Sequence, residues 1–514
     1  MKKIFLPVFA ILLLLIGLLL ARTFTFPFKK IAAATGTPAQ ITINDSSISR
    51  LSGGLKIPTI SSGDSLKFND VPFDTFNEYI KKNYPFIYQH AESYTINGHA
   101  LVFKLKGTDP NLQPLLFLSH LDVVPPGGAG IKNTETDLFQ PKDKPIPPVS
   151  KIAKEWDYGP FSGAVVNGRI YGRGTMDMKS MLFALMEALQ NTMKSGYQPK
   201  RDIYLAFGFD EEVGGELGAA RIADYFGRQR LRFDAIYDEG GFILSKGSVE
   251  GIDANVALIG CAEKGFLSLK IKVKGLGGHS SMPPSETAVG KAAAIMQKLE
   301  QNPMKPTITP LIQDFFKNVG GSMSFPSRLA IANDWLLQPL LISQLSKNHT
   351  TNALIRTTTA LTMMKGSDAP NVLSSEVEFV ANFRLLPGNT IQEVKEHVAK
   401  LAQGYDIEIS EVDNSREASI VSPSDTKGYK IMETSLNRIY PNLLITPYLT
   451  VGGTDAIKYQ ALSNNVYRFM PIKINNSEQQ SMHSINEYIS IENYTKMIRY
   501  FEFIMQNYDK DGGK

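Results

Sequence analysis

The chain has 514 residues, which is too long for one ordinary domain and predicts two or more structural units. Its hydrophobic content of 43% and charged content of 20% are typical of a globular protein and exclude a disordered one. The formal net charge is +4 and the basic residues are scattered, so no nucleic-acid partner is indicated. The single cysteine, Cys261, excludes an intrachain disulfide and a cysteine-rich zinc site. A metal site in this chain must therefore use His, Asp and Glu.

Residues 1–25 contain two lysines followed by an apolar run from Ile4 to Ala21. A helix of about 20 residues spans a bilayer, so this segment is either a membrane anchor or a cleaved signal peptide. We favour an uncleaved anchor, because no clear small-x-small cleavage site follows the leucine block. Lys2 and Lys3 would stay in the cytoplasm, which places the rest of the chain outside it, membrane-anchored or secreted. The basic residues after the run weaken this orientation.

The next segment, residues 26–262, predicts a lead-in followed by an α/β domain. Residues 26–70 are rich in Thr, Ser, Gly and Lys and indicate a linker. From there, helical stretches such as FDTFNEYIKKNYPFIYQ and MKSMLFALMEALQNTMKSG alternate with strand-like runs such as PLLFLSH, DIYLAFGF and DAIYDEGG. This alternation predicts a central, mostly parallel sheet with helices on its faces. In such sheets, ligands bind beyond the carboxyl ends of the strands.

Residues 263–415 change the pattern and predict an inserted domain. FLSLKIKVKG and SSEVEFVANFRLL alternate apolar and polar residues, as half-exposed strands do, and helical stretches follow each of them. The order strand–helix–strand–strand–helix–strand predicts a two-layer α+β domain. It carries a further, largely helical insertion at roughly 303–360. The first pattern resumes over residues 416–514, which therefore belong with residues 26–262.

Acidic residues and histidines follow several of the predicted strands. His120 and Asp122 in LLFLSHLDVVP point the same way on a strand, so that Asp122 can hydrogen-bond the far ring nitrogen of a metal-bound His120. A surface His-x-Asp pair is the alternative. Asp177 in YGRGTMDMKS lies at a strand-to-helix junction, where a helix N-cap is the alternative role.

Three further segments supply the same residue types: FGFDEEVGG with Asp210, Glu211 and Glu212; AIYDEGG with Asp238; and QQSMHSINEYIS with His483. Together with His120 and Asp177, two histidines and at least three carboxylates gather at strand ends of one sheet. Five ligands that share one carboxylate are enough for a pair of metal ions about 4 Å apart.

The ordered motifs HLDVVP, GRGTMDMKS, DEEVGG, DEGG, GGHSS and MHSINEYIS resemble the zinc-dependent carboxypeptidase and aminoacylase family over roughly residues 70–505. WDYGPFSG, DEGG and the long inserted segment resemble the carboxypeptidase S branch, which includes secreted enzymes that join or split fatty N-acyl amino acids. The resemblance implies a zinc-peptidase catalytic domain, with parts at 26–262 and 416–514. Residues 263–415 would then be a lid or dimerisation domain, through which a homodimer can form.

The resemblance also implies residue roles. Asp177 would bridge two Zn²⁺ ions, for which Co²⁺ or Mn²⁺ can substitute, and would precede a cis peptide bond. His120 and Asp238 would complete one site, and Glu212 and His483 the other. Glu211 would be the general base and Asp122 would support His120, whereas Asp210 has no assigned role.

Substrate contacts are implied at four other positions and at His279. His279 in GLGGHSS would stabilise the oxyanion, and Asn371 and Arg384 would hold the substrate; a turn histidine and a surface arginine are the alternatives. Gly453 and Thr454 in GGTD would add backbone donors. The sequence departs from many relatives at Ile457 and Lys458, where an arginine–histidine pair often follows GGTD.

The predicted function is a dinuclear zinc hydrolase that cleaves an amide or peptide bond next to a free carboxylate. Its substrate would be a small peptide or an N-acyl amino acid. The alternative is a catalytically inactive, membrane-tethered relative that only binds ligands. The intact ligand positions and Glu211 argue against that alternative.

Overall fold

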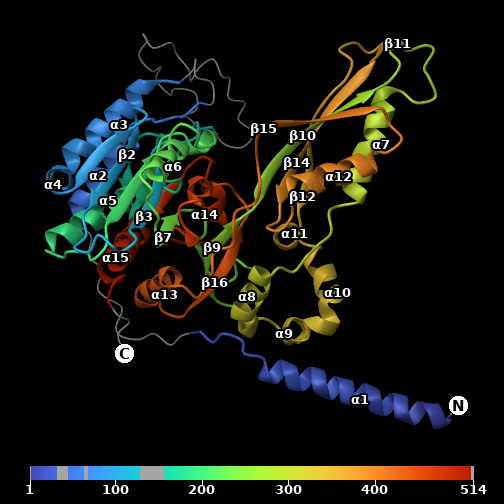
Figure 1. Ribbon diagram of the computed structural model, residues 1–514, viewed down its shortest axis with the longest axis horizontal. Helices are drawn as coiled ribbons and strands as arrows, with labels where there is room; N and C mark the ends of the chain where they lie inside the picture. Colours follow the sequence, from blue (N-terminus) through green and yellow to red (C-terminus); the bar gives the residue numbers. More distant parts are fainter. Residues whose placement is uncertain (1, 32–43, 63–67, 128–155, 250, 511–514) are drawn as a thin grey trace. The chain divides into compact units, whose positions relative to one another are not determined.

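The computed structural model describes residues 2–31, 44–62, 68–127, 156–249 and 251–510 (Figure 1). The remaining residues, including parts of the predicted 26–70 lead-in, lie outside the described chain. The residues divide into two compact units. The large unit comprises Lys29–Cys261, Ser422–Tyr448 and Thr454–Lys514, and the small unit comprises Met1–Phe28, Ala262–Val421 and Leu449–Gly453.

The large unit is built on a ten-stranded sheet in the order β1-β2-β6-β3-β7-β17-β9-β8-β18, with β16 paired to β9. Strands β6, β3, β7 and β17 run parallel to one another, whereas β1 and β2 extend the sheet in antiparallel fashion. This arrangement confirms the predicted α/β fold with a mostly parallel central sheet. The strands are β1 (Glu92–Ile96), β2 (Ala100–Leu105), β3 (Leu115–His120), β6 (Ile203–Gly208), β7 (Ala235–Asp238), β8 (Ile243–Leu244), β9 (Asn255–Glu263), β16 (Leu443–Thr450), β17 (Val466–Arg468) and β18 (Lys473–Ile474).

Strands β3, β6 and β7 are buried along their whole length, which explains their continuous apolar sequences. Helices α5 and α15 pack side by side, with α2 against α5 and α13 against α15 (Figure 1). A small three-stranded sheet joins β19, β5 and β4. The remaining elements of this unit are α2 (Asp45–Leu55), α3 (Asp70–Asn83), α4 (Pro85–His90), β4 (Val165–Val166), β5 (Arg169–Tyr171), α5 (Lys179–Lys194), η2 (Glu211–Val213), α6 (Ala219–Arg228), α13 (Lys427–Ile439), η4 (Asp455–Tyr459), α14 (Asn476–Ser481), β19 (Tyr488–Ser490) and α15 (Ile491–Asn507).

The predicted linker over residues 26–70 is wrong in part, because it contains helix α2. The Asn44 side chain caps this helix by accepting a hydrogen bond from the backbone N–H of Ser46. Leu51 is fully buried, and the Arg50 guanidinium lies 2.6 Å from the Glu187 carboxylate of α5. The helix is short and rich in Ser and Gly, so its stability comes from tertiary packing rather than from local propensity.

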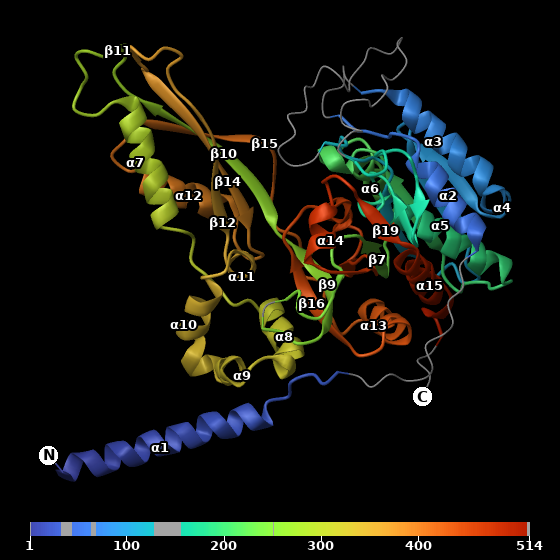
Figure 2. The same cartoon turned by 180° about the vertical axis from the view of Figure 1, so that it is seen from behind.

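The small unit contains a four-stranded antiparallel sheet in the order β12-β14-β10-β15, with helices α7 and α12 against one face (Figure 2). Strand β14 alternates between buried and less buried residues, which matches its alternating sequence. The elements are β10 (Gly265–Lys274), β11 (Gly278–His279), α7 (Ala288–Gln301), β12 (Thr358–Lys365), β13 (Val372–Leu373), β14 (Glu376–Leu385), α12 (Ile391–Leu401) and β15 (Ile407–Arg416).

Two helical parts complete the small unit. The first is the insertion between α7 and β12, formed by α8 (Pro310–Val319), η3 (Gly320–Ser322), α9 (Phe325–Ala332), α10 (Asp334–Leu345) and α11 (His349–Ile355). The second is α1 (Lys2–Thr25), the one helix among the described residues that is long and apolar enough to cross a membrane. Residues 19–23 of α1 contact the end of α9.

Candidate metal centre

Five segments of the large unit bring acidic and histidine side chains together. His120 is the last residue of β3, and Asp177 lies two residues before the start of α5. Glu212 lies in the 3₁₀ helix η2 that follows β6, and Glu239 follows β7. His483 lies just after α14. The carboxyl ends of parallel strands meet at one edge of a sheet, which explains why residues so far apart in sequence converge.

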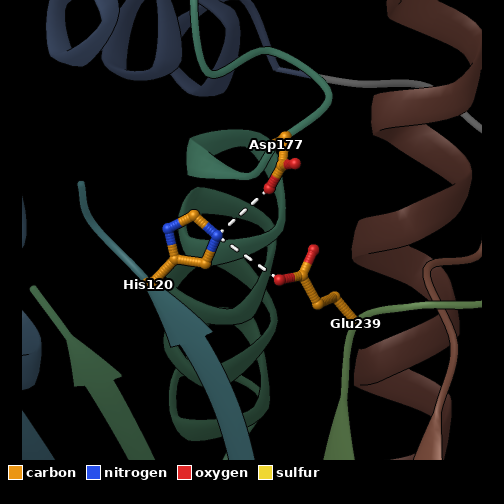
Figure 3. A group of neighbouring side chains, drawn as sticks. All are labelled: His120, Asp177 and Glu239. Atoms are coloured by element: carbon orange, nitrogen blue, oxygen red, sulfur yellow. Dashed lines mark hydrogen bonds and ion pairs between the residues drawn. The ribbon is translucent and has the colours of Figure 1, made fainter. Parts of the chain in front are cut away.

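One group of potential ligands consists of His120, Asp177 and Glu239 (Figure 3). The Nε2 atom of His120 lies 3.1 Å from Oδ1 of Asp177 and 3.4 Å from Oε1 of Glu239. On the other side of the ring, Nδ1 lies 3.2 Å from Oδ1 of Asp122. The three ligand atoms lie within 4.8 Å of one another, and His120 itself is buried. This geometry can hold one divalent cation.

A second group consists of Asp177, Glu212 and His483. The Nε2 atom of His483 lies 2.8 Å from Oδ2 of Asp177 and 3.3 Å from Oε2 of Glu212. Asp177 therefore offers one carboxylate oxygen to each group and is the residue that the two groups share. Two histidine–carboxylate sets joined through one aspartate suit a pair of ions that take nitrogen and oxygen ligands.

The alternative role of Asp177 as a helix N-cap is not what the structure shows. The N-cap of α5 is Met178, and no side chain caps that end. The expected cis peptide bond between Asp177 and Met178 is present. Burial alone would raise the pKa of Asp177, but its hydrogen bonds to His120 and His483 hold the pKa of this carboxyl well below its usual range.

Glu239, and not the predicted Asp238, lies beside His120 and Asp177 in this structure, and the role of Asp238 as a ligand stays a prediction. The Asp238 carboxylate accepts hydrogen bonds from the backbone N–H groups of Ala456, at 2.7 Å, and of Glu239, at 2.9 Å. Asp238 is the last residue of β7 and is buried, whereas Glu239 lies beyond the strand end. Burial and the Asp177 carboxylate raise the pKa of Glu239 to about 8.

Glu211 adjoins both groups without belonging to either. Its Oε2 atom lies 3.9 Å from Nε2 of His120. Burial raises the pKa of Glu211 well above its usual value, and the neighbouring carboxylates of Glu239, Asp455 and Glu212 raise it further. A carboxyl with a raised pKa beside a metal centre is suited to taking up a proton.

Asp122 and Asp210 fix the segment that carries Glu211 and Glu212. The Asp122 carboxylate accepts hydrogen bonds from the backbone N–H groups of both glutamates, each at 3.2 Å. The Asp210 carboxylate accepts from the backbone N–H groups of Leu217 and Gly218, each at 2.7 Å. Asp210, whose role the sequence left open, therefore holds the turn that follows η2, and the three adjacent carboxylates have three different environments.

Comparison with known proteins places this geometry in a family. The sequence model of peptidase family M20/M25/M40 matches residues 146–507. The chain belongs to this family. It is 34% identical over 510 residues, 97% of this chain and 93% of the relative, to a probable carboxypeptidase S-like 2 of Dictyostelium discoideum. It is also 34% identical over 509 residues, 97% of this chain and 94% of the relative, to the N-fatty-acyl-amino acid synthase/hydrolase PM20D1 of Xenopus tropicalis.

Among solved structures, the M20 family metallo-carboxypeptidase Sso-CP2 of Sulfolobus solfataricus has the same fold. Its TM-score is 0.63 at 19% identity, with 91% of this chain and 99% of that chain covered. The resemblance to the carboxypeptidase S branch is therefore confirmed, and this M20 protein is a hydrolase. The inactive relative that remained as an alternative has no support from these comparisons.

Sequence reasoning missed Glu487, which holds the Asp177 segment of this M20 enzyme in place. Glu487 is fully buried, and its Oε2 atom lies 2.5 Å from Nη1 of the buried Arg173. Its Oε1 atom accepts from the backbone N–H groups of Met176, at 2.7 Å, and Asp177, at 3.3 Å. The segment MHSINEYIS contains this glutamate four residues after His483. A long-range backbone contact of this kind has no local sequence signal.

We expect Glu487→Gln to weaken metal binding about 10–100-fold, the usual effect of losing a residue that supports a ligand. The neutral amide no longer balances Arg173, so the thermal midpoint should also fall. Metal affinity would be measured by competition with a chelating dye, and excess metal should restore activity. The matched surface change Glu492→Gln, at 74% exposure, should alter neither quantity. Unchanged affinity in Glu487→Gln would contradict the supporting role.

Asp455 is another buried carboxylate that sequence reasoning passed over, although it follows Gly453 and Thr454 directly. Burial raises its pKa well above the usual value, and the Asp238 carboxylate adds to the rise. A Cβ atom at Gly208 or Gly215 would lie 2.6 Å or 2.3 Å from the Asp455 carboxylate oxygens. The second glycine of DEEVGG, with a φ of +69°, therefore provides both the turn and the space that Asp455 occupies.

The other predicted site residues lie mostly in the small unit. His279 in β11 pairs with Val372, and the backbone N–H of Ser280 donates to the carbonyl of Asn371 at 3.1 Å, so His279 and Asn371 share one two-stranded ribbon. The His279 imidazole is exposed, and its Nδ1 lies 2.8 Å from Oγ of Ser281.

Arg384 and Gly453 belong to the same unit as His279. Arg384 lies in β14 with its guanidinium 4.7 Å from the ring centre of Phe266, and burial lowers its pKa. A Cβ atom at Gly453 would lie 2.6 Å from Nη2 of Arg416, so a larger residue there would displace that guanidinium. Thr454 lies in the large unit, and its Oγ1 accepts from Nε of Arg468 at 3.3 Å.

Proposed function

We propose that this M20 hydrolase is a dinuclear zinc enzyme that cleaves an amide bond next to a free carboxylate. The observation that carries the proposal is the carboxylate of Asp177, which contacts both histidines through different oxygens. His120 and Glu239 would hold one ion with Asp177, and Glu212 and His483 the other. Mn²⁺ or Co²⁺ fits the same nitrogen and oxygen donors.

The side chains around the two metal positions would have separate roles in catalysis. When bound, the ions supply the Lewis acidity that acidifies water and polarises a carbonyl group. Glu211 takes the proton from the attacking water and later delivers it to the leaving nitrogen. Asp122 orients His120 through Nδ1 and fixes the backbone of Glu211 and Glu212. His279 would stabilise the oxyanion, and Asn371, Arg384, Gly453 and Thr454 would hold the substrate, with Arg384 gripping its carboxylate.

Two substrate classes fit this proposal. One relative is named a probable carboxypeptidase S-like protein and another an N-fatty-acyl-amino acid synthase/hydrolase. Short peptides and N-acyl amino acids both present an amide bond beside a free carboxylate. The same chemistry therefore serves either class, and only the leaving or acyl group differs.

A hydrolysis panel tests the proposal. We expect the enzyme to hydrolyse N-acyl amino acids, dipeptides or both, and to lose this activity in a chelator and regain it when Zn²⁺ is restored. Amide analogues that lack the free carboxylate should react at least about 10²-fold more slowly, because Arg384 would then be left unpaired in its site. Inertness towards both classes in the metal-loaded enzyme would overturn the proposal.

We also propose that α1 anchors the protein in a membrane with both units outside the cytoplasm, and that the small unit can mediate a homodimer. The apolar stretch Pro7–Thr25 has the length and composition of a span, and only 6% of it is buried. N-terminal sequencing of the protein from the membrane fraction distinguishes a retained anchor from a cleaved signal. Sedimentation in detergent distinguishes a dimer from a monomer.

A further inference from the structure

Helix α10 carries an apolar face that the described part of the chain leaves exposed. Trp335, Leu336 and Leu340 are 54%, 41% and 63% exposed, and their spacing places them on one side of the helix. The sole charged residue of α10 is Asp334, and Leu341 is its one buried residue. A helix at the surface of a soluble domain normally turns charged residues outwards. The composition of this face therefore indicates an apolar occupant.

The junction between α9 and α10 forms hydrogen bonds with α1. Asn333 is fully buried, and its Nδ2 donates to the carbonyl of Leu19 and to Oγ1 of Thr23, each at 3.1 Å. The Arg22 guanidinium donates through Nε to the carbonyl of Ala332 at 3.2 Å. Both views of the fold show α9 beside the C-terminal end of α1 (Figures 1 and 2). The same Nδ2 also donates to the carbonyl of Leu329 at 2.9 Å, so removing α1 would take away two of the three acceptors of this amide.

The same contacts determine how deep the junction between α9 and α10 would lie in a bilayer that α1 spans. The candidate span runs from Pro7 to Thr25, so Leu19 lies six residues, or about 9 Å, inside its C-terminal end. Amphipathic helices that lie on a membrane enter the headgroup and acyl boundary to about 5–10 Å. The residues around Asn333 therefore lie at the depth where an interfacial helix rests.

Aromatic and basic residues around this junction match the composition of a membrane interface. The ring of Phe24 lies 5.9 Å from that of Phe325, and Phe24 is exposed. Arg22 is on the same turn of α1, and Trp335 is the second residue of α10. Tryptophan is enriched at both membrane–water interfaces, and arginine side chains near the end of a span extend to the interface. Contact of the α10 face with a second copy of this chain would not require a membrane span and interfacial aromatic residues beside that face.

We propose that α10 rests in the headgroup region of the same lipid bilayer that α1 spans, with Trp335, Leu336 and Leu340 against the acyl chains. The small unit is then attached to the membrane at two places, the span and the α10 face. The inference depends on α1 being retained and not on the chemistry at the metal centre, so the two proposals fail separately.

Tryptophan fluorescence tests the contact directly, because the chain has only two tryptophans, Trp156 and Trp335. The full chain would be reconstituted in phosphatidylcholine vesicles with or without lipids brominated on the acyl chain. The difference between the wild type and Trp335→Phe isolates the signal of Trp335. Trp156 is 5% exposed and donates to the Pro126 carbonyl in the large unit, so it serves as an internal reference.

We expect brominated lipid to quench Trp335, aqueous iodide to leave it largely unquenched, and its emission to be shifted to the blue. The double variant Leu336→Glu/Leu340→Glu should lose most of the lipid quenching. The matched control Leu276→Glu, at a leucine that is 72% exposed in the same unit, should keep it.

Two results would overturn the inference. One is quenching of Trp335 by iodide and not by brominated lipid, which would place the α10 face in water. The other is protection from both quenchers that disappears when the protein is diluted among more vesicles, which would identify a second copy of the chain as the occupant. Circular dichroism of each variant confirms that the comparison is between folded proteins.

Discussion

Replacing Asp177 with asparagine should deprive the enzyme of both metal ions at once. Oδ1 of Asp177 lies 3.1 Å from His120 and Oδ2 lies 2.8 Å from His483, so one carboxylate serves both groups. Asparagine keeps the volume but offers one neutral oxygen and an N–H₂ donor in place of a second acceptor. We expect fewer than one ion per chain after dialysis, measured by elemental analysis, and a loss of activity of more than about 10²-fold.

The control for this variant is Asp224→Asn, which makes the same change at an exposed residue that pairs with Arg228 on α6. It should retain both metal content and activity. Two ions and unchanged activity in Asp177→Asn would disprove the shared ligand. One ion bound per chain would show instead that the two groups bind independently, and would contradict the predicted joint loss.

Replacing Glu211 with glutamine should abolish turnover while leaving metal binding intact. Glu211 lies beside both candidate groups and belongs to neither, so removing its charge leaves the five ligands in place. General acid–base catalysis contributes about 10²–10⁴-fold, and kcat should fall by that amount while KM changes little. The zinc content of the variant should equal that of the wild type.

The pH dependence distinguishes a base from a residue that merely shapes the site. Glu211 must be unprotonated to accept a proton, so the activity of the wild type should rise with pH through the raised pKa of this carboxyl. The residual activity of Glu211→Gln should lack that acidic limb. Glu216→Gln, the same change five residues later at an exposed side chain that pairs with Lys458, should keep the wild-type profile. Full activity in Glu211→Gln would remove Glu211 from the mechanism.

The fold was largely predictable from sequence because its strands carry strong local patterns. Strands β3, β6 and β7 are buried on both faces and read as continuous apolar runs, whereas β10 and β14 alternate. Helix α2 escaped prediction because its Ser- and Gly-rich sequence has little helical propensity. The buried pair of Arg50 and Glu187 joins residues far apart in the chain, which no local window can detect.

Local sequence patterns predicted only part of the candidate site. His120, Asp177, Glu212 and His483 stood out because each follows a strand or precedes a helix, and the fold brings all four together. Which of Asp238 and Glu239 lies nearer to His120 could not be predicted from DEGG, because both are carboxylates next to the same strand end. It depends on the backbone amide of Ala456, which engages Asp238 and so leaves Glu239 to face His120.

By itself, the sequence determined the residue types available for chemistry and the order of the elements that carry them. One cysteine and seven histidines limited any metal site to nitrogen and oxygen ligands, and the apolar N-terminal run could be recognised by length alone. Only the tertiary structure shows which carboxylate faces each histidine. It also shows that Glu487 hydrogen-bonds the Asp177 segment and that Asn333 hydrogen-bonds α1. These are contacts between residues tens to hundreds of positions apart, and their energies depend on burial and distance, which the order of residues does not contain.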